Sequence, residues 1–359
     1  MEKNFYSEEE IIDIWEKKLP ALREEETFNI YVDNPFCINQ CLYCKHTGSD
    51  YKEYFNECKN YYEKLLPSQI KKFNHLFKIR KPDTIYFGGG SSSIMSAQTM
   101  RNIFETIDGF RKIPNKVFEA LPNLMNEEKV DILIKNKFSY FSFGVQSLKK
   151  SVLEYNNRQG YDNIPLKKYI SDLEKGGVRV NCDLMAFIGE EKDDIKEVKR
   201  VREDFVKLVK EYAPSFITIY PETNFLKENR KKGIELSKEL RKMILRLEKK
   251  YNLGHHDKHL SLDEKDIERG MEVCYHLTTT SSGEIDRVKK YDSTGPGGEI
   301  SKIETQNVLS FGGFRHHQPY SYHGKDFLYF NINDDNKRIN YFGIKTKPKK
   351  MEFTNMDFI

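Results

Sequence analysis

The chain has 359 residues, of which 38% are hydrophobic and 32% charged, and its mean hydropathy is −0.71. It contains no apolar run of about eighteen residues, so the sequence predicts no membrane span. The net charge is only +4 and the two signs are interleaved, which argues against a nucleic-acid partner. The N-terminal fifteen residues carry acids where a signal peptide has its apolar core, so we expect a cytoplasmic protein. Its six cysteines should then stay reduced, which favours metal or redox roles over disulfides.

Strand-like and helix-like segments alternate along the first two thirds of the chain. After an N-terminal helical segment (1–27), short apolar, β-branched or aromatic runs predict strands at 28–32, 83–87, 116–120, 138–145, 178–185 and 215–220. Helices are predicted between them at 51–73, 94–110, 126–136, 149–156, 166–175 and 190–212. We interpret the charges of 191–205 as a solvated helix face. The alternation favours a parallel sheet, either doubly wound or a partial (β/α) barrel, with functional residues at the C-terminal strand ends.

The pattern changes beyond residue 225. A charged helical stretch covers 228–251, a second helical stretch lies near 261–271, a glycine-rich segment follows at 293–299, and 311–331 is rich in aromatic residues and histidine. We therefore expect a core over 28–225 and a smaller C-terminal α+β region over 226–359 that covers the open end of the core.

Three cysteines, Cys37, Cys41 and Cys44, lie in a C-x3-C-x2-C pattern after the first predicted strand. They could be a buried apolar cluster, or a zinc site completed by His46, although structural zinc sites usually split their ligands into two separated pairs. An iron–sulfur cluster fits better, because closely spaced thiolates can bind neighbouring irons of one cluster. Three thiolates would leave one iron of a [4Fe–4S] cluster open for a ligand.

The segment YVDNPFCINQCLYC (31–44) resembles the opening of radical S-adenosylmethionine (SAM) enzymes, and more narrowly of the oxygen-independent coproporphyrinogen III oxidase-like group. Five further segments resemble motifs of that group in the same order: TIYFGGGSS (84–92), VFEALPN (117–123), SFGVQSLKKSVLEYNNRQ (142–159), NCDLMAFIG (181–189) and FITIYPET (216–223). The resemblance spans roughly residues 28 to 225. It implies a partial (β/α)6 barrel of the radical SAM type.

The resemblance also implies cofactors and the residues that bind them. A [4Fe–4S] cluster on Cys37, Cys41 and Cys44 would cleave SAM reductively to a 5′-deoxyadenosyl radical. Gly88, Gly89 and Gly90 would let the backbone approach the amino-acid end of SAM, although an ordinary strand–turn glycine run remains open. Members of the group can hold two SAM molecules. The positions matching the first are Tyr31, Gly90 and Glu119, and those matching the second are Tyr43, Ser91, Ser92, Gln146, Arg158 and Asp183.

Alternatives stay open for individual residues. Glu119 could instead be a core-edge glutamate paired with a lysine. Cys58, Cys182 and Cys274 have no close partners in the sequence, and we expect them to be small core residues.

The C-terminal half departs from the family. The H-N-x-x-Y-W segment of the related haem chaperone is absent from 275–291, while 307–324 resembles the group's later glycine-rich strand. A changed substrate region predicts a small-molecule substrate other than a porphyrinogen, and more similarity to class C methyltransferases and cyclopropanases of the superfamily. In that reading a second SAM donates a methyl or methylene carbon to an sp2 carbon. The alternatives are oxidative decarboxylation, a tetrapyrrole transformation, or a haem chaperone with His316 and His317 as ligands. The enzyme would need a low-potential reductant such as flavodoxin or ferredoxin.

Overall fold

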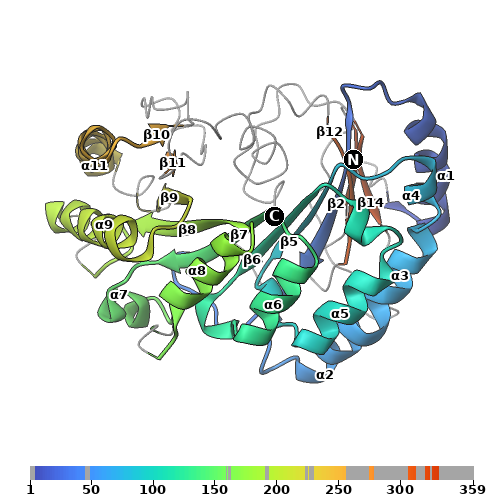
Figure 1. Cartoon of the computed structure of the whole chain (residues 1–359), viewed down its shortest axis with the longest axis horizontal. Coiled ribbons are helices and arrows are strands. Elements are labelled where there is room, and N and C mark those ends of the chain that lie inside the picture. Colours follow the sequence, from blue (N-terminus) through green and yellow to red (C-terminus); the bar gives the residue numbers. More distant parts are fainter. Residues whose placement is uncertain are drawn as a thin grey trace.

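The computed structural model describes residues 5–44, 49–158, 160, 163–190, 194–222, 225, 230–255, 275–278, 306–312, 320–323 and 326–330. A curved sheet runs through this part of the chain, and helices lie along its outer side (Figure 1). The predicted helix near 261–271, the glycine-rich segment 293–299, and His46, Cys274, His316 and His317 lie outside the described residues.

The six predicted strands are confirmed, and they pair in parallel in the order of the sequence. They are β2 (Thr27–Asn34), β5 (Thr84–Gly89), β6 (Asn115–Ala120), β7 (Tyr140–Gln146), β8 (Arg179–Ala186) and β9 (Phe216–Pro221). The partial barrel of the prediction is therefore present, and the C-terminal ends of these strands meet at one rim.

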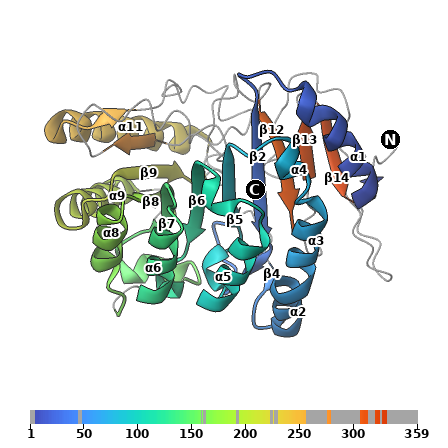
Figure 2. The same cartoon turned by 45° about the vertical axis from the view of Figure 1, so that its right-hand side comes forward.

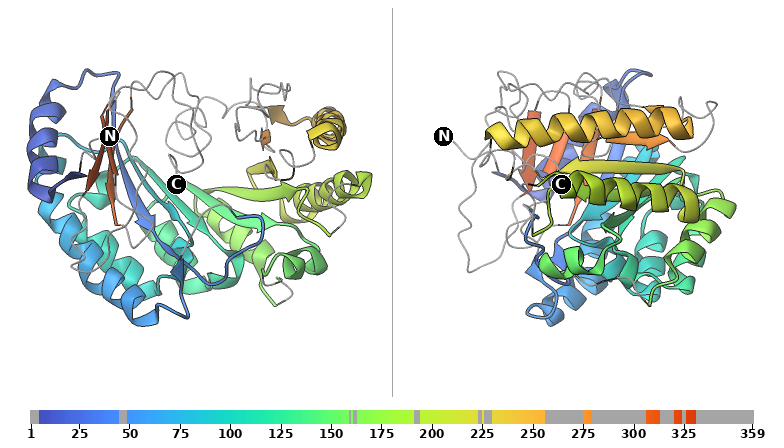
Figure 3. Two further views of the ribbon diagram at one scale, coloured as in Figure 1. Left: turned by 180° about the vertical axis from the view of Figure 1, so that it is seen from behind. Right: turned by 90° about the vertical axis from the view of Figure 1, so that its left-hand side faces the viewer.

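Helices follow the strands as the alternation predicted, and they pack on the outer face of the sheet (Figures 1 and 3). The helices are α1 (Glu8–Lys18), α2 (Phe55–Asn60), α3 (Leu66–Phe73), α4 (Leu76–Ile79), α5 (Ala97–Thr106), α6 (Glu127–Lys135), α7 (Lys150–Tyr155), α8 (Leu166–Lys175), α9 (Ile195–Lys207) and α11 (Arg230–Tyr251). A π-helical turn, Tyr61–Leu65, joins α2 to α3, and α11 packs against α9. No helix in the described ranges is both long and apolar enough to cross a membrane.

The described strands of the C-terminal part of the chain pair with the edges of the core sheet. Strand β12 (Gln306–Phe311) adds in parallel to β2, and β13 (Tyr320–His323) and β14 (Asp326–Phe330) continue that edge up to β1 (Phe5–Tyr6) (Figure 2). At the opposite edge, β11 (Tyr275–Thr278) and β10 (Gly254–His255) pair antiparallel next to β9. Both edges of the six-stranded core would otherwise present unpaired backbone groups, and the C-terminal strands cover them.

The two faces of the sheet differ in chemistry because side chains alternate along each strand. The outward residues, such as Phe28, Phe87 and Phe141, are apolar and fully buried under the helices. The inward residues include tyrosines, carboxylates and hydroxyl groups, among them Tyr31 and Ser142. The fold therefore places its apolar core outside the barrel wall and leaves a polar inner wall for chemistry. Cys58 and Cys182 belong to the apolar core, as predicted.

Helix α1 closes one end of this core. Ser7 caps its N-terminus in a capping box with Glu10, and Trp15 is completely buried against Phe28, with 5.2 Å between ring centroids. We expect Trp15→Ala to lower the free energy of unfolding by about 3–5 kcal/mol, measured by urea denaturation. Leu65→Ala, at a side chain that is 53% exposed, should cost less than about 1 kcal/mol. Equal losses in both variants would contradict a packed N-terminal helix.

Candidate functional site

The three clustered cysteines lie where β2 ends. Cys37 closes the two-residue strand β3 (Phe36–Cys37), which pairs with β4 (Ser49–Asp50), and its carbonyl accepts from the Tyr51 amide at 2.8 Å. Cys41 and Cys44 follow in a turn in which the Cys44 amide donates to the Cys41 carbonyl at 3.0 Å. All three are free thiols of intermediate exposure. The structure therefore holds them in one loop at the predicted rim.

The donor set of this loop, three thiols, suits an iron–sulfur cluster. Within the described residues, no three His, Cys, Asp or Glu side chains converge as they would around one metal ion. The thiols are nevertheless neighbours, because the pKa of Cys37, raised to about 12 mainly by burial, is raised further by Cys44 and Cys41. Thiolates that bind different irons of a cluster stand further apart than ligands of one ion, and binding deprotonates them. Three neighbouring thiols in one loop are a donor set that an iron–sulfur cluster can use.

The glycine run Gly88–Gly90 packs the end of β5 against this loop. A Cβ atom on Gly90 would lie 2.5 Å from the Phe36 carbonyl oxygen and 2.8 Å from the Cys37 sulfur. Gly89 has φ +97°, and a Cβ there would lie 2.5 Å from Asp33 Oδ1. A Cβ on Gly88 would meet the rings of Tyr86 and Tyr31. The backbone at these three positions must therefore lie close to other groups, which glycine allows. In this structure those groups belong to the cysteine loop, the end of β2 and the two tyrosines.

Ser91 and Ser92 follow the glycine run, and their side chains are turned into the protein. Both are buried, with 4% and 1% of their surface exposed. The Ser91 hydroxyl contacts the Ser93 hydroxyl at 3.0 Å, and the Ser92 hydroxyl donates to the Gly88 carbonyl at 3.4 Å. Their hydroxyl groups therefore support the glycine turn from within.

Tyr31 and Glu119 are brought together by a residue that the sequence analysis missed. The ring of Tyr86 stacks on Tyr31, with 5.7 Å between centroids, and its hydroxyl donates to Glu119 Oε1. Among the described residues, the partner of Glu119 is thus a tyrosine and not a lysine. Burial raises the pKa of this half-buried carboxyl to about 7, the Tyr86 hydrogen bond opposes the rise, and the charge of Asp183 adds to it. Tyr86 lies directly beside Tyr31 in the register of β2 and β5, and both face inward. Tyr86 could therefore be recognised as a site residue only once the pairing of these two strands was known.

Asp183 is the centre of a second polar group on the inner wall. Ser142 donates to its Oδ2 at 2.8 Å and Asn181 donates to its Oδ1 at 2.6 Å. Thr218 in turn donates to Asn181 Oδ1 at 2.9 Å. Burial raises the pKa of Asp183 to about 6, although these two hydrogen bonds and the charge of Arg158 lower it. The carboxyl is therefore fixed in orientation from three neighbouring strands, β7, β8 and β9.

Arg158 joins the cysteine loop to the end of β7. It donates to the Tyr43 hydroxyl at 3.0 Å, to the Cys41 sulfur at 3.7 Å and to the Gly144 carbonyl. Next to it, Gln146 has a positive φ of +66° at a bulge in the strand. Its Oε1 atom is buried without a hydrogen-bond partner in the described part of the chain. An unsatisfied buried acceptor of this kind suits a ligand that donates to it.

These contacts bring all predicted site residues except the two serine side chains to one rim of the barrel. Tyr31, Tyr86 and Glu119 form one group, and Tyr43, Gln146 and Arg158 form another beside Asp183. The two groups adjoin, since the charge of Asp183 acts on the pKa of Glu119. Ser142 and Thr218 are additional polar residues of the wall that the sequence motifs did not single out.

Comparison with known proteins agrees with this geometry. A family model described as the radical SAM superfamily matches residues 31–202. The chain is similar to the heme chaperone HemW of Bacillus subtilis, 27% identical over 161 residues, which cover 43% of this chain and 41% of the relative. It is also similar to the oxygen-independent coproporphyrinogen-III oxidase-like protein HemZ of the same organism, 26% identical over 211 residues, or 56% of this chain and 42% of the relative.

The matches thus span less than half of each curated relative's own length. Among solved structures, coproporphyrinogen III oxidase (HemN) from Escherichia coli has the same fold, with a TM-score of 0.62 at 14% identity, over 90% of this chain and 70% of that chain. Residues 31–202 therefore match a radical SAM domain, and over part of its length the chain is similar to an oxygen-independent coproporphyrinogen-III oxidase-like protein.

Proposed function

We propose that this protein is a radical SAM enzyme in which Cys37, Cys41 and Cys44 hold a [4Fe–4S] cluster and two SAM molecules bind at the adjoining rim. The cluster, when bound, supplies the electron that cleaves SAM and generates a radical. The second SAM would provide a methyl or methylene carbon for an sp2 carbon of a small-molecule substrate. A low-potential reductant such as flavodoxin or ferredoxin would deliver the electron.

The observation that carries this proposal is the presence of two adjoining polar groups beside one cysteine loop. In the first, Glu119 in its ionised form can accept from the ammonium group of SAM, while the stacked rings of Tyr31 and Tyr86 wall the site. In the second, Asp183 can accept from ribose hydroxyls and Gln146 Oε1 offers a free acceptor. Arg158 holds this second group to the cysteine loop through Tyr43.

A second candidate function is the handling of haem or another tetrapyrrole. It is supported by the relatives that are named heme chaperones. The inner wall also carries a small cluster of buried hydrophobic side chains, Tyr31, Tyr86 and Val117, with Tyr140 and Val308 packed against them. Oxidative decarboxylation with an assisting second SAM is a further variant of the same chemistry.

An isotope experiment separates these functions without knowledge of the substrate. The reconstituted protein is reduced with dithionite and given SAM that is fully deuterated in its methyl group. If the radical abstracts hydrogen from the methyl group of a second SAM, deuterium appears in 5′-deoxyadenosine. Unlabelled 5′-deoxyadenosine together with stoichiometric haem binding would instead support the tetrapyrrole function and contradict carbon transfer.

The affinity for SAM should depend on pH through Glu119. Its pKa of about 7 means that the carboxyl is largely protonated at lower pH, where it cannot attract a cationic group. Binding of a cation favours the ionised form, so affinity should rise with pH by up to about tenfold per unit below pH 7 and then level off. The Kd of Glu119→Gln is divided by the Kd of wild type at each pH. The titration of SAM itself affects both Kd values equally and therefore cancels in this ratio. That ratio should grow from near one at about pH 6 to about ten at about pH 8; a ratio independent of pH would contradict the assignment.

A further inference from the structure

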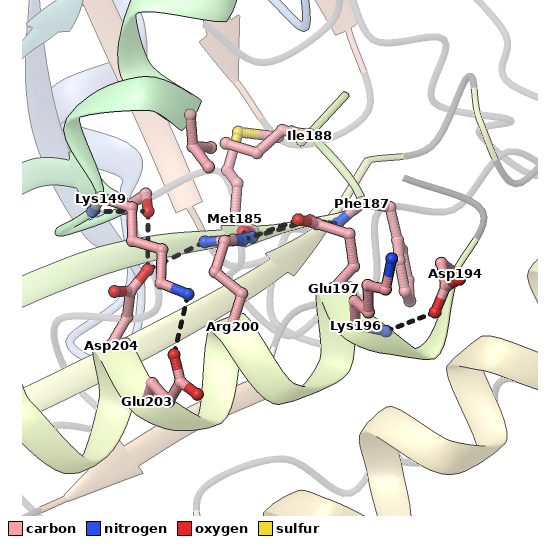
Figure 4. Close-up of polar contacts among 12 residues, drawn as sticks. Lys149, Met185, Phe187, Ile188, Asp194, Lys196, Glu197, Arg200, Glu203 and Asp204 are labelled. Atoms are coloured by element: carbon pink, nitrogen blue, oxygen red, sulfur yellow. Dashed lines mark hydrogen bonds and ion pairs between the residues drawn. The ribbon is translucent and has the colours of Figure 1, made fainter. Parts of the chain in front are cut away.

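Three charged residues of α9 are buried against the sheet, where the sequence analysis expected a solvated face. Glu197, Arg200 and Asp204 are 5%, 4% and 3% exposed. Arg200 Nε donates to Glu197 Oε1 at 2.9 Å and Arg200 Nη1 donates to Asp204 Oδ2 at 2.9 Å (Figure 4). One guanidinium therefore bridges two buried carboxylates, whose charges would otherwise be costly at this depth.

Each member of this charged trio also binds the end of a neighbouring strand. Arg200 Nη2 donates to the Met185 carbonyl at 2.5 Å and Glu197 Oε2 accepts from the Phe187 amide at 3.1 Å (Figure 4). Asp204 Oδ2 accepts from the Ser147 hydroxyl at 2.7 Å. The trio thus connects the C-terminal end of β8 to that of β7.

The residues at these strand ends have an unfavourable backbone conformation. Gln146, which precedes Ser147, and Phe187 both have φ +66°. A positive φ is rare for residues other than glycine, and it persists only where the surroundings hold it. The hydrogen bonds of the trio with Ser147, Met185 and Phe187 stabilise this backbone conformation. A Cβ atom on Gly189 would lie 2.3 Å from Glu197 Oε1, so glycine at this motif position admits the carboxylate.

The segment after β8 in turn supports the cysteine loop. Asn156, which is 2% exposed, donates from Nδ2 to the Ile188 carbonyl at 2.7 Å. Its own carbonyl accepts from the amide of Leu42, between Cys41 and Tyr43, at 3.4 Å. A shift of the segment 187–188 would therefore be transmitted to the loop as well as to Gln146.

We propose that Arg200 is a positioning residue of the SAM site, which acts by fixing the ends of β7 and β8 so that Gln146, Asp183 and the cysteine loop keep their mutual geometry. This inference rests on the proposed function only in that these residues bind SAM. Arginine suits the role because its planar fork reaches Glu197, Asp204 and the Met185 carbonyl at once, whereas a lysine ammonium keeps the charge but cannot span all three.

The test compares Arg200→Lys with Arg202→Lys, an exposed arginine on the same helix. Arg200→Lys keeps a counter-charge for the two carboxylates, so the protein should fold and take up wild-type amounts of iron. We expect the Kd of SAM, measured by calorimetry on the cluster-loaded protein, to rise about tenfold, as for the loss of one well-placed hydrogen bond. The rate of 5′-deoxyadenosine formation at saturating SAM should fall by less than threefold. Arg202→Lys should match wild type in both quantities.

Two further measurements separate positioning from a purely structural role. Ser147→Ala removes the link between Asp204 and β7, together with the hydrogen bond that the Ser147 hydroxyl accepts from the Lys149 amide at 3.1 Å. It should weaken SAM binding in the same direction. In protein without cluster or SAM, amide hydrogen exchange of residues 185–189 should be faster in Arg200→Lys than in Arg202→Lys. Unchanged SAM affinity in Arg200→Lys would overturn the inference. Loss of fold and iron in Arg200→Lys, with Ser147→Ala equal to wild type, would also overturn it. If wild type itself binds no SAM, the proposed function fails instead.

Discussion

Replacement of any one of Cys37, Cys41 and Cys44 by alanine should abolish both the iron–sulfur absorbance and the SAM cleavage of the reconstituted protein. Each thiolate would bind a different iron, so loss of one leaves a cluster with two protein ligands in a loop of intermediate exposure. We expect 5′-deoxyadenosine formation to fall by more than about a thousandfold, a change in activation free energy of at least about 4 kcal/mol. The measurements are iron and sulfide content, visible absorbance, and product quantified by chromatography.

Cys58→Ala is the matched control for these variants. Cys58 is a free thiol on α2 that is buried in the apolar core of the protein, with 2% of its surface exposed. Its replacement should leave cluster content and SAM cleavage at wild-type levels and cost only a small cavity. Retention of a full cluster in any of the three loop variants would contradict the assignment of that cysteine.

Asp183→Asn should weaken SAM binding by about 10- to 100-fold, equivalent to about 1.5–3 kcal/mol for hydrogen bonds to a charged group. Both carboxylate oxygens of Asp183 accept hydrogen bonds from the wall, from Ser142 and from Asn181. An asparagine would place an amide group, itself a donor, against one of these donors and would leave less acceptor capacity for ribose hydroxyls. Calorimetry on the cluster-loaded variant gives the Kd of SAM, and circular dichroism checks the fold.

The comparison for this variant is Asp131→Asn on the exposed surface of α6. This change alters the net charge equally and should leave the Kd unchanged. A wild-type Kd and a wild-type rate in Asp183→Asn would remove Asp183 from the binding site, and with it much of the support for a second SAM.

The strands were predictable because their outward residues form runs of large apolar side chains bounded by turns, as at 83–87 before Gly88. The cysteine loop and its glycine turn were predictable because they are local in sequence. Tyr86 and Ser142 could not be found this way. They resemble ordinary strand residues, and only the register that sets Tyr86 beside Tyr31 and Ser142 beside Asn181 reveals a shared wall.

Helix α9 shows a different reason for failure. Val198, Val201, Phe205 and Leu208 recur at helical spacing and are buried, but Ile195, which has the same spacing, is 41% exposed. The buried face is rotated towards Glu197, Arg200 and Asp204, whose charges satisfy one another and the strand ends. Sequence periodicity alone cannot distinguish a charged residue that pairs in the interior from one that faces water, since both have helical spacing.

The pairing of C-terminal strands with the edges of the core could not be predicted, for a topological reason. Residue 225 is where the strand–helix alternation ends, but the edge strands β2 and β9 need partners, and β12 and β11 supply them. Such long-range pairing leaves little local signal in the sequence.

The most direct measurement is electron paramagnetic resonance of the reconstituted protein after reduction with dithionite, recorded without and with SAM. A three-cysteine [4Fe–4S] cluster predicts a signal of a reduced cluster whose shape changes when SAM binds the open iron, and the signal should be lost in Cys37→Ala. A protein that instead takes up one zinc ion per chain and gives no cluster signal would contradict the assignment of the cysteine loop.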